Sequence, residues 1–263
     1  MLVFSAIVPH SPLLLPSVGK EHREKLSQTL NGYHEVEEGL YASRPDTLVI
    51  ISPHAPLYPD AFSANMCDKF VGTAKEFGDH GTSIGAQADF LLIDHIHRSM
   101  RDAQVPFTLT SNTEIDYGYT VPLCLLTSHL KQWKLAPLAI SGLDVAAHLR
   151  FGQALKHVIH EESRRIAIIA SVDLSHHINA LSPQGERPEG AVFENAVKEA
   201  IQTNSTKPLE QLSPAVLEGA GQCAYKPLLI LLGLQQNVQV TPRIYSYEAP
   251  FGVGYLTAQF ILA

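Results

Sequence analysis

Three separate apolar segments are each followed by histidine, a side chain that binds metals and transfers protons. The segments and the histidines after them are residues 2–8 with His10, residues 47–51 with His54, and residues 166–170 with His176 and His177. Short apolar runs of this kind are typical of strands buried in a parallel sheet. Because open α/β sheets bind ligands outside the carboxyl ends of their strands, we expect these imidazoles to converge.

Neutral imidazoles without paired cysteines nearby are typical ligands of a catalytic Fe, Mn, Ni or Zn ion that keeps open coordination positions. Iron held by two histidines and one carboxylate is the arrangement that this pattern favours. A single histidine after a strand is more often a hydrogen-bonded turn residue, so the hypothesis depends on recurrence at three strand ends. A further loop at residues 114–123 precedes an apolar helix and is expected to line the same crevice.

The other nine histidines are expected at the surface. Eight fall on predicted helices, mostly on polar faces, and one falls in a glycine-flanked loop: His22, His34, His95, His97, His129, His148, His157 and His160, then His80. A serine nucleophile elbow (GxSxG) and the glycine-rich phosphate-binding motifs are absent from the sequence. Serine hydrolase chemistry and nucleotide binding therefore lack support.

The composition describes a globular chain with a large core. Of 263 residues, 45% are hydrophobic and 17% are charged, against roughly 25% charged in an average protein. The net charge of −7 and the absence of a basic run argue against a nucleic-acid partner. Low charge also favours an apolar contact between copies, so a homo-oligomer is expected.

The cysteines and the apolar segments bear on the compartment. The 3 cysteines have no paired spacing, so neither a disulfide framework nor a structural zinc site is indicated, and a cytoplasmic location is expected. Residues 1–16 lack a cationic start and contain three prolines, which argues against a signal peptide. The longest apolar run, residues 227–234, is too short to span a membrane, which takes about 20 residues.

Strand-like and helix-like segments alternate along the chain. Residues 135–140 form a fourth apolar run, and apolar positions recur at helical spacing within residues 26–40, 90–100 and 193–201. This alternation predicts an α/β fold whose central, largely parallel or mixed sheet is flanked by helices on both faces. Residues 238–248 and 253–262, separated by a turn, predict a C-terminal antiparallel hairpin. We expect a surface loop at 183–188 and a single domain over residues 1–263.

Several short motifs occur in order along the chain. They are PHSP at 9–12, ISPH at 51–54, DYG at 116–118, VPL at 121–123, DLSH at 173–176, QCA at 222–224 and SYEAPFGVGY at 246–255. Together they resemble the LigB-like superfamily of class III extradiol dioxygenases. The resemblance is greatest to the branch that includes AmmeMemoRadiSam-associated and Memo-type proteins, and it spans nearly the whole chain.

The resemblance implies a role for each of these residues. It implies that His10 and His54 are ligands of Fe(II), with Zn or another divalent ion as alternatives, and that His176 is the acid or base beside a catechol-like substrate. Asp173 then orients His176 or helps to bind the substrate, although an Asx-type cap of the following turn explains it equally well. Tyr117 and His177 are the expected substrate contacts.

Two departures from the family pattern affect the expected site. The related proteins carry Glu-Cys-Gly where this chain has QCA at 222–224, and Asp-His-Gly where it has DYG at 116–118. For the third ligand we therefore rank the neutral amide of Gln222 first, Cys223 second and Glu248 third. A Cys223 thiolate would resemble the Memo-type site and would favour Cu, Zn or Fe. The alternative role of Cys223 is as a small buried residue at a helix start.

The expected function is that of a non-haem, Fe(II)-dependent extradiol dioxygenase that opens the ring of a small catechol-type substrate with dioxygen. The alternative is a Memo-like protein that binds a metal or ligand without this activity. Metal-dependent hydrolysis, in which the ion activates water, is the third hypothesis.

Overall fold

The computed structural model describes all 263 residues and has a mixed α/β fold built on an eight-stranded sheet, as predicted. The strand order is β10-β11-β1-β9-β2-β8-β3-β6. The bounds of these strands are β1 Leu2–Val8, β2 Thr47–Ser52, β3 Phe62–Asn65, β6 Phe107–Thr110, β8 Lys134–Ala139, β9 Ile166–Ser171, β10 Val240–Glu248 and β11 Tyr255–Leu262.

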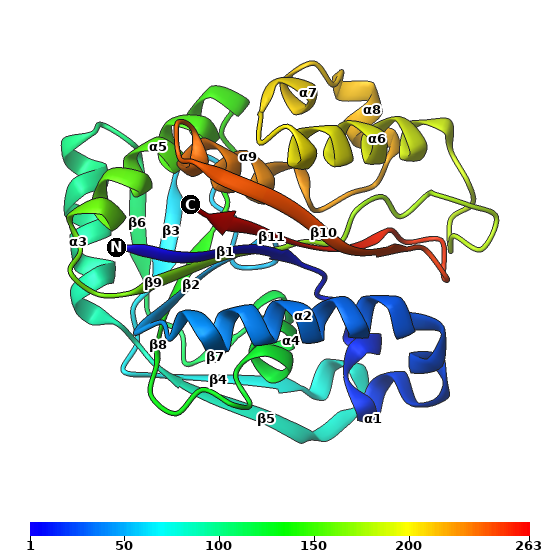
Figure 1. Ribbon diagram of the computed structural model, residues 1–263, viewed down its shortest axis with the longest axis horizontal. Coiled ribbons are helices and arrows are strands. Elements are labelled where there is room, and N and C mark those ends of the chain that lie inside the picture. Colours follow the sequence, from blue (N-terminus) through cyan, green and yellow to red (C-terminus); the bar gives the residue numbers. More distant parts are fainter.

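Four parallel strands, β1, β9, β2 and β8, form the centre of the sheet. Every residue of β2 and β9 is buried, as their aliphatic sequences require for strands covered on both faces. The strand ends are aligned, because Val8 of β1 pairs with Ser171 of β9, and Ile51 of β2 pairs with Ala170. The loops that follow β1, β9 and β2 therefore leave the sheet at one edge (Figure 1).

Helices cover both faces of the sheet, with α2 and α4 on one side and α5, α6 and α9 on the other (Figure 1). The α-helices are α1 Pro16–Gly19, α2 Ser27–Ser43, α3 Phe90–Asp102, α4 Tyr117–Leu126, α5 Val145–Glu161, α6 Pro188–Gln202, α7 Lys207–Glu210, α8 Pro214–Gly219 and α9 Tyr225–Gln235. Short 3-10 helices span Pro12–Leu14, Lys20–Leu26 and Lys75–Phe77. None of the helices combines the length and the apolar character needed to cross a membrane.

The C-terminal strands β10 and β11 pair in antiparallel fashion, which confirms the predicted hairpin. β11 continues the sheet by pairing antiparallel to β1, so the sheet is mixed rather than purely parallel. The turn between the two strands contains Gly252, which has a φ of +74°. Residues other than glycine rarely adopt this backbone conformation. A Cβ at this position would also lie 2.1 Å from the backbone nitrogen of Ser182.

A second sheet of three strands, in the order β5-β4-β7, was not predicted. Its strands are β4 Lys69–Ala74, β5 Asp79–Gln87 and β7 Glu114–Ile115. Helix α4 packs against β4 closely enough that a Cβ at Gly72 would lie 2.4 Å from the Thr120 hydroxyl. The small sheet thus covers the outer side of α4, the helix that begins beside the carboxyl edge of the central strands (Figure 1).

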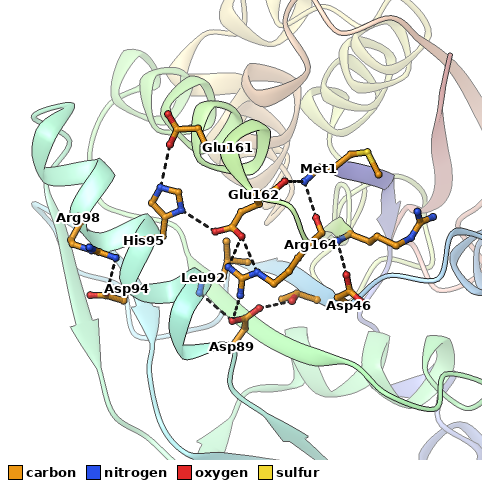
Figure 2. Close-up of polar contacts among 12 residues, drawn as sticks. Met1, Asp46, Asp89, Leu92, Asp94, His95, Arg98, Glu161, Glu162 and Arg164 are labelled. Atoms are coloured by element: carbon orange, nitrogen blue, oxygen red, sulfur yellow. Dashed lines mark hydrogen bonds and ion pairs between the residues drawn. The ribbon is translucent and has the colours of Figure 1, made fainter.

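The amino ends of the central strands are joined by a network of charged groups (Figure 2). The buried carboxylate of Asp89 accepts a hydrogen bond from the Thr47 hydroxyl at 2.5 Å and pairs with the Arg164 guanidinium. Arg164 also donates to Glu162, whose other oxygen lies 2.9 Å from Nδ1 of His95. Every charge in this network therefore has a partner within the chain.

Candidate metal centre

Three adjacent strands bring His10, His54 and His176 to the same edge of the sheet. His10 follows β1, His176 follows β9 and His54 follows β2, and these strands are neighbours in the order β1-β9-β2. His10 is only 1% exposed, whereas His54 and His176 are partly buried. The convergence expected from strand topology is therefore present.

The imidazoles of His10 and His54 face each other through their Nε2 atoms, which lie 3.0 Å apart. The Sγ atom of Cys223 lies 3.3 Å from Nε2 of His10, and the three donor atoms all lie within 4.8 Å of one another. Nitrogen and sulfur ligands bind Zn²⁺ at about 2.0–2.3 Å, which places two donors of one ion roughly 3–4 Å apart. The donor set of His10, His54 and Cys223 therefore fits a single transition-metal ion.

Hydrogen bonds at neighbouring strand ends hold the imidazole of His10 and the backbone of His54. Nδ1 of His10 lies 3.0 Å from the hydroxyl of Ser171, the last residue of β9, which leaves Nε2 directed at the cluster. The backbone N–H of His54 donates to the Ser52 hydroxyl at 3.1 Å, and this hydroxyl donates to Asp116 at 2.7 Å. A contact such as that of Ser171 fixes ring orientation in metal sites, whereas the Ser52 contact fixes the backbone at His54.

Cys223 occupies the third position of the cluster. It lies in the turn before α9, where its thiol donates to the carbonyl of Asp173 at 3.3 Å and accepts from the backbone N–H of the same residue at 3.4 Å. Burial raises the pKa of this thiol far above its usual value, and the negative charge of Asp173 adds to the shift. The free thiol is thus neutral, and a bound cation would be needed to stabilise the thiolate.

The other two candidates for the third ligand make different contacts. The side-chain oxygen of Gln222 accepts from the backbone N–H of Tyr225 at 2.7 Å, within the first turn of α9. One carboxylate oxygen of Glu248 accepts from the backbone N–H of Thr29 at 2.6 Å, within the first turn of α2. Both oxygens therefore stabilise helix starts in this structure, whereas the Sγ atom of Cys223 forms a cluster with the imidazoles of His10 and His54.

Burial shifts the pKa values of the cluster toward the uncharged forms. It lowers the pKa of His10 to about 3, with the positive charge of His176 as a further cause, and lowers the pKa of His54 to about 4. Burial also raises the pKa of Asp173 to about 6. At neutral pH both histidines are unprotonated, which is the form that binds metals.

His176 has a buried Nε2 atom without a hydrogen-bond partner. Its backbone N–H donates to the carbonyl of Ala220 at 3.0 Å, which fixes the loop but leaves the imidazole free. Burial lowers the pKa of His176, and the nearby charge of Asp173 opposes this shift. An unpaired buried imidazole nitrogen beside a donor cluster is suited to exchange a proton with a ligand.

Asp173 and His177 have identifiable structural contacts. Asp173 accepts from the backbone N–H of His10 at 3.0 Å, and its other oxygen lies 3.8 Å from Nε2 of that residue. It therefore lies beside the donor cluster. His177 is buried, and its Nδ1 lies 2.7 Å from the carbonyl oxygen of Gly185, so it holds the loop that precedes α6.

Tyr117 is the first residue of α4, and Asp116 caps that helix by accepting from the backbone N–H of Gly118 at 2.8 Å. The phenol ring of Tyr117 stacks on His54 with ring centroids 4.4 Å apart. Its hydroxyl lies 2.9 Å from Nε2 of His54. Tyr117 therefore contacts the donor cluster itself.

A pocket of about 480 Å³ reaches Cys223 from the side of α8 and α9. Its wall combines apolar residues such as Pro53, Ile140 and Leu217 with Glu218 and Lys226. A space of this size, with apolar walls and few charges, accommodates a small organic molecule.

The supporting roles of Ser52, Ser171 and Asp116 were not predicted, although Ser52 and Ser171 each end a strand and Asp116 has the type and position of a helix cap. The expected surface position of His148 is wrong. This residue is fully buried, with Nδ1 2.8 Å from the carbonyl of Asp144 and Nε2 3.5 Å from the backbone nitrogen of Ser141.

The chain is similar to known proteins over nearly its whole length. The family model of the catalytic LigB subunit of aromatic ring-opening dioxygenase matches residues 5–258. The chain is 24% identical over 258 residues to Protein CA_C1420 of Clostridium acetobutylicum, an alignment that covers 95% of this chain and 55% of the relative. The chain thus spans about half the length of this relative. An uncharacterized protein of Escherichia coli K12, JW3007, has the same fold, with a TM-score of 0.67, 19% identity, and 98% of this chain and 99% of the other covered.

Proposed function

The chain belongs to the family of LigB catalytic subunits of aromatic ring-opening dioxygenases, and from this premise we propose that it is a metal-dependent dioxygenase that opens a small catechol-type ring. The observation that carries the proposal is the placement of three neutral metal donors next to an imidazole nitrogen without a partner. The donors suit a transition metal, and the imidazole suits a substrate that must lose a proton.

His10, His54 and Cys223 are the residues that would hold the ion, which we propose to be Fe(II). Bound iron would supply the one-electron chemistry through which dioxygen reacts with a phenol. The chain contributes the neutral state of both imidazoles, maintained by burial, and the hydrogen bonds to the hydroxyls of Ser171 and Ser52 that hold the two ligand residues in place. The metal is thereby retained at neutral pH without a carboxylate ligand.

His176 is the proposed base for the substrate. Its pKa is lowered by burial, so the imidazole is unprotonated and accepts the proton of a phenol hydroxyl at Nε2. The imidazolium that results lies near Asp173, whose negative charge favours the protonated ring.

One observation favours a second candidate, a metal- or ligand-binding protein without ring-opening activity. The third donor is a thiol, and the side chain of Gln222 is engaged with the backbone of α9 rather than with the cluster. A thiolate is softer than a carboxylate and suits Zn or Cu as well as Fe.

The test begins with metal analysis of protein that was purified without chelators or affinity metals. The protein is then loaded with Fe(II) under anaerobic conditions. A panel of catechols is added with dioxygen, and oxygen uptake is measured. Oxygen uptake by the wild type that is lost in His176→Gln supports the proposed dioxygenase. Bound metal without oxygen uptake supports the binding protein, and a protein that binds neither iron nor zinc contradicts both functions.

A further inference from the structure

The Tyr117 hydroxyl contacts the same nitrogen of His54, Nε2, that would bind the ion. The hydroxyl lies 2.9 Å from Nε2 of His54, and the same Nε2 lies 3.0 Å from Nε2 of His10. A neutral imidazole has a single acceptor nitrogen. When that nitrogen of His54 binds an ion, it can no longer accept the Tyr117 hydroxyl, which is left at the edge of the donor cluster without its partner.

The surroundings of Tyr117 restrain its ring beside the donor cluster. One face stacks on the His54 ring, with centroids 4.4 Å apart and planes inclined by 27°. Phe77 meets the ring edge-on with centroids 5.3 Å apart, and His10 does so at 5.5 Å. The backbone is held at the first turn of α4 by the Asp116 cap. The phenol oxygen therefore remains beside the donors when an ion enters.

We propose that the phenol oxygen of Tyr117 is a fourth protein ligand of the ion, together with His10, His54 and Cys223. The proposal rests on the metal site of the proposed function and specifies its coordination. On binding, the phenol and the thiol release their protons to solvent, and the ion gains two anionic donors. This provides negative charge to the ion although none of its proposed ligands is a carboxylate.

The fourth ligand has a consequence for substrate binding. A phenol side chain has the same reactive group as the proposed phenolic substrate, so it occupies a coordination position that such a substrate requires. An incoming catechol must then displace Tyr117 from the ion. Loss of the hydroxyl should therefore weaken retention of the metal and strengthen the binding of an added phenol.

The test compares the wild type with Tyr117→Phe, which removes one oxygen atom and keeps the ring stacked on His54. Both proteins are loaded with Fe(III), because phenolate bound to ferric iron absorbs visible light and its ring vibrations are enhanced in resonance Raman spectra. The control is Tyr58→Phe, which removes the hydroxyl of a tyrosine in the exposed loop that follows His54. Circular dichroism confirms that each variant is folded.

The proposal predicts phenolate bands in the wild type and in Tyr58→Phe, their absence in Tyr117→Phe, and a shift of the bands when tyrosine is labelled with ring deuterium. It also predicts that Tyr117→Phe binds Zn²⁺ more weakly and 4-nitrocatechol more tightly than the wild type. Iron retained by the wild type without phenolate bands would overturn the role of Tyr117 and leave the proposed function intact. A wild type that retains no metal would overturn both.

Discussion

The two ends of the central strands hold buried and partly buried polar groups of contrasting kinds. At the amino ends the charged groups of Asp89, Arg164 and Glu162 form, with His95, a network in which each has a partner (Figure 2). At the carboxyl ends the metal donors are neutral imidazoles and a thiol, which lie beside the carboxyl group of Asp173, and Nε2 of His176 has no partner. The first arrangement is complete within the chain, whereas the second is completed by a ligand.

The contrast shows how one sheet supports stability and chemistry at once. A buried charged side chain needs a partner of opposite charge. Removal of that partner at the amino end is therefore expected to destabilise the protein rather than impair binding. Neutral donors can be buried without matching charges, so their removal from the carboxyl end is expected to affect binding rather than folding. Substitutions at the two ends should therefore separate stability from metal affinity.

The largest effect is expected for Arg164→Met at the amino end. This change leaves the carboxylate of Asp89, which is 1% exposed, without its guanidinium. We expect the free energy of unfolding to fall by about 3 kcal/mol, within the range for an uncompensated buried charge. Urea denaturation measures this loss, and Arg164→Lys, which keeps a charge, is the milder control. An unchanged midpoint, or metal affinity lost without a loss of stability, would break the contrast between the two ends.

At the carboxyl end, His54→Ala should weaken Zn²⁺ binding by about 100-fold, equivalent to about 2.7 kcal/mol. The physical reason is the loss of one of three donors that lie within 4.8 Å of one another. Competition with a chromophoric chelator measures the affinity. His95→Ala, which removes an imidazole from the network at the amino end, should bind Zn²⁺ as the wild type does. Equal losses in both variants would show that the two ends are not functionally distinct.

A third prediction uses His148, a buried histidine near the carboxyl end whose two nitrogens both have neighbours within the chain. Burial lowers its pKa from 6.5 to about 4. The unfolded chain therefore binds the proton more tightly, so the stability contributed by neutral His148 is complete above pH 6.5 and is lost as the pH falls toward 4. A shift of this size corresponds to about 3 kcal/mol, and we expect relaxation around the charged ring to reduce the loss to about 2 kcal/mol.

Urea denaturation of metal-free protein at pH 7 and pH 4 tests this expectation. His148→Gln should reduce the acid sensitivity by that amount, because its amide can still donate to Asp144 but does not titrate. Protonation of His10 and His54 also destabilises the protein at pH 4, but it does so equally in the wild type and in His148→Gln. The difference in acid sensitivity between these two proteins therefore measures the contribution of His148. Equal acid sensitivity in the two proteins would be evidence against burial as the cause.

The smallest effect is expected for Gln222→Ala. Its side-chain oxygen accepts from the backbone N–H of Tyr225 in the first turn of α9, so the change should cost about 0.5–1 kcal/mol of stability, as for other capping contacts. Zn²⁺ affinity should change by less than about twofold, which is below 0.5 kcal/mol. A tenfold loss of affinity would instead indicate that Gln222 is a ligand and would replace Cys223 in the donor set. Thermal unfolding and the chelator competition provide the two measurements.

Much of the central sheet could be predicted from the sequence because its strands are continuous apolar runs. The predicted segments 2–8 and 166–170 match β1 and β9 to within one residue, and the hairpin of β10 and β11 was found from its turn. The small sheet was not predicted, since β5 contains two glycines and alternates between exposed and partly buried positions without a clear apolar face. Short strands such as β3 and β6 depend on tertiary pairing rather than on local pattern.

The convergence of His10, His54 and His176 followed from strand topology, because parallel neighbours end at one edge. The third donor could not be found in this way. Cys223 lies in a turn before α9 rather than after a strand, and only the resemblance to known proteins drew attention to it. The interaction of Gln222 with the α9 backbone depends on the local turn, which the residue type alone does not determine. His148 was misplaced because a single buried imidazole on a mixed helix face has no distinctive spacing.

The separation of the donors along the chain makes metal uptake a measure of folding. His10 and Cys223 are 213 positions apart, and His10 contacts Asp173 across 163 positions. Contacts of such long range close large loops and form slowly. The donors meet only after β1 has been inserted between β9 and β11, strands that are synthesised much later. Time-resolved binding of a chromophoric metal during refolding would therefore mark the moment at which the first strand of the chain reaches its place.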